Sequence, residues 1–232
     1  MTRMANAARD PRTRRFATAA DLGLAPREFA ILRRLDTPAK IQAFVNAIPA
    51  NHEFGGETVL CVREVLRQRR AHCIEGAMVA AAAMWANGIP PLLMHLDCHI
   101  SDYPHVVAVF RHRGHWGAIS KTNAPPLRYR DPVYRTLREL ALSYFHEYLN
   151  KRGMKTLRSY SRPIDMRSIP VSEWVVSEKN CWKTHDRITA LRHYPLITRA
   201  QEKVVEKIDR FAHQALRTLQ YPRPQRPERP GR

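Results

Sequence analysis

Residues 73–90, with the sequence CIEGAMVAAAAMWANGIP, predict a buried helix that opens on a cysteine. Small residues dominate its first turns, among them Gly76 and Ala77, and they would let the helix pack closely against a sheet. Asn87-Gly88 is typical of a helix end, and Ile89-Pro90 prevents continuation because the residue before proline avoids helical backbone. We therefore place one helix over residues 73–87.

The chain before this helix is predicted to be helical as well. Thr37-Pro38 begins a short helix, since threonine is a natural cap and proline suits the first turn. Gly55-Gly56 interrupts the helical pattern. Residues 57–70 then read as an amphipathic helix, with apolar side chains spaced one helical turn apart against arginines.

The pattern changes after Pro90 to short segments rich in β-branched and aromatic residues. We predict strands at 91–98, 105–111 and 115–121, with the Arg113-Gly114 turn joining the last two as a hairpin. A helix is expected over 132–150, an irregular region over 154–195, and a last helix that begins at a Thr198/Gln201 capping box and runs to Leu219.

The order of elements predicts an α+β protein of one domain with decorations. The chain has 232 residues, and 44% of them are hydrophobic, which is enough to bury a core. We expect a disordered basic N-terminal tail over 1–20, the core over 21–150, a helical C-terminal extension over 151–221, and a disordered Arg/Pro-rich tail over 222–232.

Cys73 lies where a thiol nucleophile needs to lie. The free N–H groups at a helix N-terminus carry partial positive charge, which lowers the pKa of a cysteine placed there. The same groups can bind the oxyanion of a tetrahedral intermediate. His105 begins the segment His-Val-Val-Ala-Val-Phe, and a histidine at a strand start beside this helix could serve as the base.

The ordered set of these pieces resembles the transglutaminase-like superfamily, which has a papain-like fold. The resemblance covers about residues 57–121 and rests on the stretch from Cys73 to Ala77, Gly88-Ile-Pro90, the segment opened by His105, and Trp116. It implies a Cys-bearing helix packed on a small antiparallel sheet, with extra C-terminal helices. In that family a cysteine, a strand-borne histidine and an aspartate on the adjacent strand form the site.

The third position departs from this family. Aligning Trp116 with the family's hairpin tryptophan puts Ser120 where the aspartate belongs. A serine accepts a hydrogen bond from histidine but carries no charge to stabilise an imidazolium. Asn123 is the other candidate to orient the ring, and Asp102 and Asp131 are further options on loops.

The first functional hypothesis is a cysteine-dependent enzyme acting on an amide or thioester, by hydrolysis, peptide cleavage or acyl transfer. It needs no cofactor, and we expect a peptide or protein substrate. The alternative is a catalytically weakened transglutaminase-like fold that binds peptides or proteins. A further alternative is a basic nucleic-acid-associated protein, because the net charge is +18 and both tails are rich in arginine.

Other residue patterns narrow the remaining classes. The four cysteines (Cys61, Cys73, Cys98, Cys181) form no CxxC pair, and without a secretory signal we expect free thiols and a cytoplasmic protein. The apolar run at 77–86 is too short for a transmembrane segment. His95, Asp97 and His99 would share a strand face, but no second ligand pair accompanies them, so no metal is expected.

Overall fold

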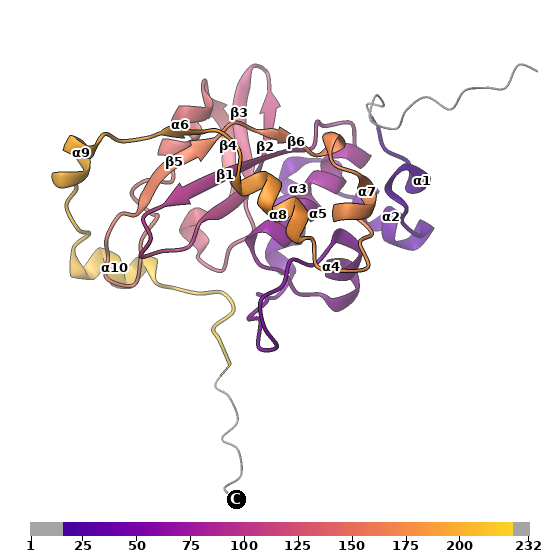
Figure 1. Cartoon of the computed structure of the whole chain (residues 1–232), viewed down its shortest axis with the longest axis horizontal. Coiled ribbons are helices and arrows are strands. Elements are labelled where there is room, and N and C mark those ends of the chain that lie inside the picture. The colour runs from indigo at the N-terminus through magenta and orange to yellow at the C-terminus, as the bar shows by residue number, and fades with distance from the viewer. Residues whose placement is uncertain (1–15, 225–232) are drawn as a thin grey trace, which may run out of the picture.

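The computed structural model describes residues 16–224 as an α+β fold built on an antiparallel sheet of seven strands. The sheet order is β4-β3-β2-β1-β5-β7, and β6 pairs with β1 beside β5 (Figure 1). The expected tails fall mostly at 1–15 and 225–232, outside the described residues. Residues 16–20, which the predicted N-terminal tail included, belong to the fold: the Ala17 N–H donates to Trp85 O, and α1 (Ala19–Leu22) follows at once.

The central helix is α5 (Cys73–Ala86), as the sequence predicts. From Ile74 onward every residue of the helix is buried. It packs on β2 (His105–His112) and β1 (Leu92–Cys98), and its small side chains permit that approach. The helix ends at the predicted place, with Asn87 as its cap and Gly88 at a φ of 79°.

The sheet separates two hydrophobic cores, because successive side chains on a strand point to opposite faces. Val106 and Ala108 on β2 pack toward α5, and Val107 and Val109 pack on the other face. The second face is covered by α6 (Leu137–Leu142) and the turns after it, which bury Tyr144. Helices therefore flank the sheet on both sides (Figure 1).

Helices α2 (Pro26–Arg33), α3 (Pro38–Ala47) and α4 (Val62–Gln68) pack around α5. Thr37 caps α3 as predicted. The helix predicted over 57–70 is wrong in its first part, since α4 begins only at Val62. The Val59 N–H donates to Asn180 and the Leu60 N–H donates to Glu75. Side chains distant in sequence therefore bind this stretch in a non-helical conformation.

The predicted hairpin is confirmed, with β2 and β3 (His115–Ile119) joined through Arg113 at φ 46° and Gly114 at φ 86°. The helix predicted over 132–150 is wrong. β4 (Arg130–Tyr134) adds an edge strand to β3, which is a position that tolerates Pro132. Only α6 remains helical, and the 3-10 turn Pro125–Leu127 precedes the strand.

The C-terminal region is not the helical extension expected over 151–221. β5 (Leu157–Ser161), β6 (Ile164–Asp165) and β7 (His193–Pro195) complete the sheet, and the 3-10 turn Met166–Ser168 follows β6. Helices α7 (Val171–Trp174) and α8 (Trp182–Thr189) lie between β6 and β7 in sequence. The periodicity of 154–195 was obscured because each of these elements is short.

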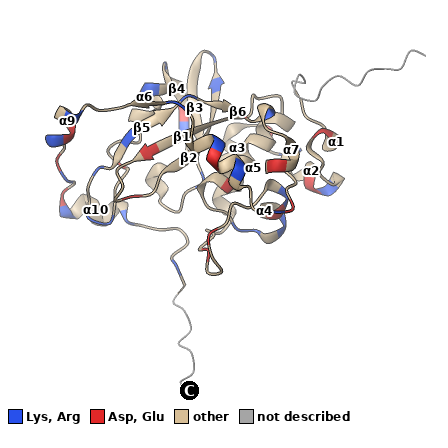
Figure 2. Ribbon diagram, viewed as in Figure 1, with Lys and Arg blue, Asp and Glu red and all other residues tan. Residues whose placement is uncertain are grey.

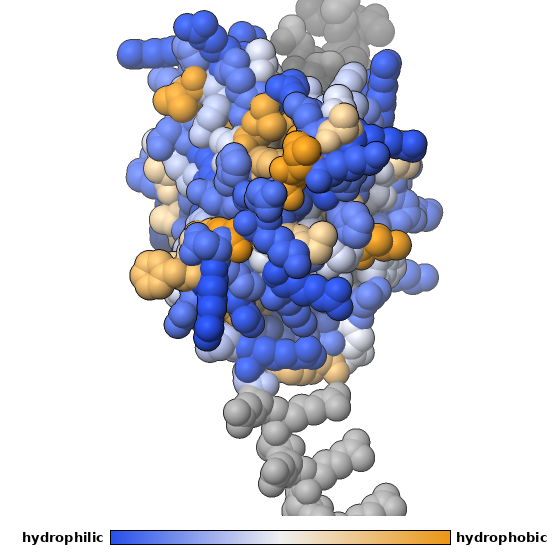
Figure 3. All heavy atoms as spheres, turned by 90° about the vertical axis from the view of Figure 1, so that its left-hand side faces the viewer, coloured by the Kyte–Doolittle hydropathy of each residue, from blue (hydrophilic) through white to orange (hydrophobic). Residues whose placement is uncertain are grey.

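The single helix predicted from Thr198 to Leu219 is also wrong. The Thr198 capping box does open α9 (Arg199–Lys203), but the chain then loops before α10 (Arg210–Leu216). Val204 and Phe211, which the pattern placed on a buried face, are largely exposed. Figure 3 shows this side of the molecule as mainly hydrophilic with scattered hydrophobic side chains. Within residues 16–224, no helix has the length and apolarity that a membrane span requires.

Replacing Gly76 by alanine is expected to destabilise the fold. A Cβ there would lie 2.3 Å from Lys121 Cβ and 2.5 Å from its Cγ, too near the Lys121 backbone for the side chain to swing away. The overpacking costs about 1–3 kcal/mol, against a gain in helix propensity of about 1 kcal/mol. Urea unfolding measures the difference. Gly55→Ala is the matched control, since no atom lies within 4 Å of its Cβ, and equal midpoints for the two variants would contradict the packing.

Candidate functional site: a thiol and an imidazole at the start of α5

Cys73 is the first residue of α5 and is half-buried at the junction of two cavities. One cavity of about 390 Å³ and one of about 230 Å³ share only Cys73 and His72 among their lining residues. His72 is the residue that caps the helix. The backbone N–H groups of the first helical turn have no carbonyl partner within the helix, so they could bind the oxygen of a carbonyl that meets the thiol.

His105 is the first residue of β2 and lines the smaller cavity together with Cys73. Its Nε2 atom lies 2.7 Å from Ser120 Oγ, just beyond the end of β3. Because Nε2 is engaged by Ser120, Nδ1 is the ring nitrogen that is left to exchange a proton with the Cys73 thiol. The fold thus brings together three of the residues predicted from the sequence: Cys73, His105 and Ser120.

The pKa of the Cys73 thiol lies well below its ordinary value. Burial alone would raise it, and hydrogen bonding and charge from His105 and then His72 outweigh that effect. The other thiols shift the opposite way: burial raises the pKa of Cys61, and it raises the pKa values of Cys98 and Cys181 to about 12. Cys73 is therefore the cysteine whose surroundings favour the thiolate.

His72 is a site residue that the sequence analysis missed. Its Nε2 lies 2.7 Å from Thr58 O, 3.3 Å from Glu75 Oε1 and 3.6 Å from Glu53 Oε1. Burial would lower its pKa, but the Cys73 thiolate, followed by the Glu75 carboxylate, raises the pKa of His72 to about 9. At neutral pH an imidazolium therefore stands directly beside the thiolate.

Glu75 lies fully buried beneath the thiol and binds the loop before α4 to the start of α5. Its carboxylate accepts hydrogen bonds from Leu60 N and Thr58 Oγ1, each at 2.8 Å, and from His72 N at 2.8 Å. Asn51 Nδ2 donates from 3.2 Å. A carboxylate in the first turn is favoured by the helix dipole alone, and only the fold shows that Glu75 also fixes the position of His72.

Ser120 is held rigidly, which fixes the orientation of His105. Its side chain is fully buried, and Gln42 on α3 clamps its backbone, with Oε1 accepting from Ser120 N at 2.8 Å and Nε2 donating to Ser120 O at 2.9 Å. Asn123 also lines the smaller cavity, but its amide binds the backbone of Tyr221. The ring partner is therefore Ser120 and not Asn123.

The aspartates considered as substitutes contact other groups. Asp102 accepts a hydrogen bond from Thr156 Oγ1, and Asp131 lies exposed on β4. Two basic residues that follow Ser120 in the sequence, Lys121 and Arg130, are also bound to other groups. Lys121 is 2% exposed and donates to Ile48 O, while Arg130 donates to Glu147. Burial, followed by the charge of Arg128, lowers the pKa of Lys121 to about 8.

The larger cavity runs from Cys73 between apolar walls that include Val59, Ile74 and Val106, toward Trp182 on α8. His95 also borders it, and its Nδ1 lies 2.8 Å from His193 Nε2. Burial, followed by the neighbouring His193, lowers the pKa of His95 to about 4. No group of three or more His, Cys, Asp or Glu side chains within residues 16–224 is arranged to hold a metal ion.

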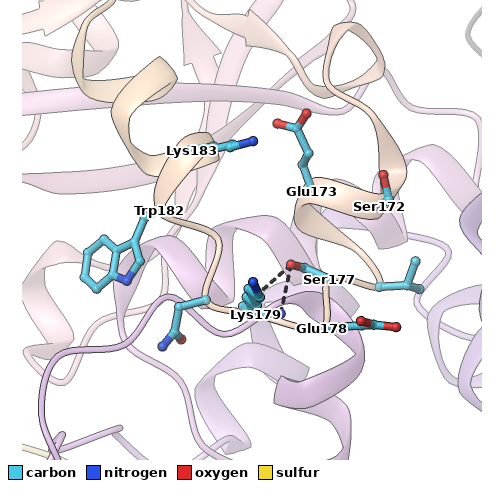
Figure 4. Close-up of a pocket in the computed structure, with 9 residues that line it drawn as sticks. Ser172, Glu173, Ser177, Glu178, Lys179, Trp182 and Lys183 are labelled. Atoms are coloured by element: carbon cyan, nitrogen blue, oxygen red, sulfur yellow. Dashed lines mark hydrogen bonds between the residues drawn. The ribbon is translucent and has the colours of Figure 1, made fainter.

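A further surface pocket of about 460 Å³ lies between α7 and α8 (Figure 4). Glu173 and Lys183 face it from the two helices, and Ser177 binds the backbone of Lys179 at its base. The side chain of Trp182 separates this pocket from the larger cavity, since it lines both. Cys73 does not line the pocket, so we do not assign it to the thiol site.

Comparison with known proteins gives this chain no family. No protein-family model matches it, and a search of curated proteins found no match.

Proposed function

We propose that this chain is a cysteine-dependent enzyme of transglutaminase-like, papain-like type that acts on an amide or thioester carbonyl. One observation carries the proposal: the only thiol with a lowered pKa among the described residues begins a helix where two cavities meet, beside an oriented imidazole. Perturbed ionisation in a cleft is typical of nucleophilic sites. The resemblance over residues 57–121 supports the same reading.

The proposed reaction uses two displacements at one carbonyl. The Cys73 thiolate attacks the carbonyl carbon, and the first N–H groups of α5 stabilise the oxyanion. His105 gives a proton to the leaving amine or thiol, and the acyl group remains on Cys73 as a thioester. His105 then takes a proton from water or from an acceptor amine, which attacks the thioester and restores the thiolate.

Trapping of the acyl-enzyme tests this proposal. With p-nitrophenyl acetate, we expect a burst of p-nitrophenolate and one acetyl group on the peptide that contains Cys73, detected by mass spectrometry. Cys73→Ala should lose both signals and keep its fold. Acetylation spread evenly over lysines, with no burst, would remove the proposal.

A peptide-binding module without catalysis is the second candidate. Ser120 favours it, because a neutral hydroxyl at 2.7 Å from His105 supplies no charge to an imidazolium. In the trapping experiment a binding module gives no burst.

Contact with nucleic acid has weaker support. Figure 2 shows lysine and arginine positions spread along the ribbon and interspersed with aspartates and glutamates. Salt-insensitive mobility with random DNA and RNA would remove this candidate.

A further inference from the structure

The C-terminal segment Gln220–Arg223 lies against the wall of the smaller cavity, far in sequence from the thiol. Asn123, which lines that cavity, holds the backbone of Tyr221 from both sides: its Nδ2 donates to Tyr221 O at 2.6 Å, and its Oδ1 accepts from Tyr221 N at 2.7 Å. Asn123 O also accepts from Gln220 N at 3.1 Å. These three bonds are made to backbone groups of the segment, so they do not depend on its side chains.

The side chains of the segment are held as well. Tyr221 OH donates to Asn46 O at 2.9 Å, and Lys121 Nζ lies 5.2 Å from the centroid of the tyrosine ring. A cation at this distance from a ring face is attracted to it. A buried lysine and a helix-end carbonyl thus form a fitted slot for one tyrosine.

Two residues after Tyr221 the segment contacts the loop between α3 and α4. The Arg223 guanidinium lies 5.2 Å from the centroid of the Phe54 ring, and Phe54 packs on His52, which lines the cavity with Cys73. In Figure 1 the yellow segment after α10 passes the loop between α3 and α4, which carries Phe54. A short stretch of chain thereby contacts Asn123, which lines the cavity that holds the thiol, and Phe54, which packs on another lining residue.

We propose that the groove formed by Asn46, Phe54, Lys121 and Asn123 is a peptide-binding site, which the chain's own Gln220–Arg223 fills in the described structure. Its ligand is a peptide with a tyrosine that enters the slot and a basic residue two positions later. As the route by which a peptide substrate reaches Cys73, the groove rests on the proposed function, whereas peptide binding itself does not.

Attachment to the chain gives the segment a strong advantage over a free peptide. A tethered ligand has an effective concentration in the millimolar range for a short flexible connection. A peptide added to the intact protein must compete with it. Removal of the tyrosine ring should empty the slot and weaken docking of the segment, which then keeps only its backbone bonds to Asn123. The fold should tolerate the change, because Tyr221 is half-buried and lies outside both cores.

The test measures binding of a fluorescent peptide with the sequence of residues 218–224, TLQYPRP, to full-length chains that all carry Cys73→Ala. We expect the Tyr221→Ala chain to bind it at least about tenfold more tightly than the Leu219→Ala chain, which keeps the segment docked. Asn123→Ala added to Tyr221→Ala should remove the gain. Tyr221→Phe, which loses only the hydroxyl, should give an intermediate affinity.

Equal affinity of the Tyr221→Ala and Leu219→Ala chains would overturn the proposal, as would equal binding of a scrambled peptide of the same composition. The two proposals fail separately. Peptide binding without acyl trapping would support the peptide-binding groove and refute the enzymatic function. Acyl trapping without peptide binding would support the enzymatic function and refute the groove.

Discussion

Glu75→Ala is expected to lose about 3–5 kcal/mol of the free energy of unfolding, which is a large part of the stability of a domain this size. The carboxylate is fully buried and accepts from Leu60 N, His72 N and Thr58 Oγ1. Alanine removes the acceptor of these three donors, of which the Leu60 N–H is buried, and each buried donor left unpaired costs about 1–3 kcal/mol. Urea unfolding followed by circular dichroism gives the value.

Two further variants show whether the loss comes from these bonds. Glu75→Gln keeps the shape of the side chain, but its NH₂ group then faces the N–H and O–H donors that the carboxylate accepted from. We therefore expect the Glu75→Gln protein to be destabilised almost as much as the Glu75→Ala protein. Glu64→Ala, in the first turn of the neighbouring α4, removes a carboxylate that binds Gln68 and Arg67, which are both exposed. It should stay within about 0.5 kcal/mol of the parent. Equal losses for Glu75→Ala and Glu64→Ala would refute a central role for the buried carboxylate.

His105→Gln is expected to slow alkylation of Cys73 by iodoacetamide about tenfold at pH 6.5. His105 is the foremost group that lowers the pKa of the thiol, so its loss returns Cys73 toward ordinary behaviour. An ordinary thiol with a pKa of about 8.5 is only about 1% thiolate at pH 6.5. The more basic thiolate is also more nucleophilic, which returns part of the rate and leaves a net loss of about tenfold.

The sign of this effect depends on pH. Above pH 9 both proteins carry the thiolate, so the variant should react as fast as the parent or faster. His112→Gln, at the exposed end of the same strand, is the matched control and should match the parent at every pH. A His105→Gln chain with an unchanged rate at pH 6.5 would show that the imidazole does not stabilise the thiolate.

Local signals in the sequence placed the elements that carry the site. The apolar run with its Asn87-Gly88 end defined α5, and the Arg113-Gly114 turn defined the β2–β3 hairpin, because both signals act within a few residues. The predictions were wrong where residues distant in sequence determine the backbone conformation. Residues 57–61 are extended because Glu75 and Asn180 bind them, and β4 forms because β3 offers it an edge.

The candidate site shows the same contrast between local signals and contacts distant in sequence. Cys73, His105 and Ser120 were found because a resemblance fixed their order and spacing. The role of His72 could have been suspected from its place beside the cysteine, three residues before Glu75 in a capping box. By contrast, the use of Asn123 as a clamp for Tyr221 depends on a contact across 98 residues. No local pattern carries that information.

The pH dependence of Cys73 alkylation in the intact protein tests the central claim most directly. Mass spectrometry would follow iodoacetamide labelling of each cysteine between pH 5 and pH 10, with Cys61 and Cys181 as internal references because burial raises their pKa values. We predict that Cys73 labels first, with half-maximal rate well below the ordinary thiol pKa of about 8.5. A Cys73 that titrates at or above that value, or labels no faster than Cys61, would contradict the thiolate–imidazole site.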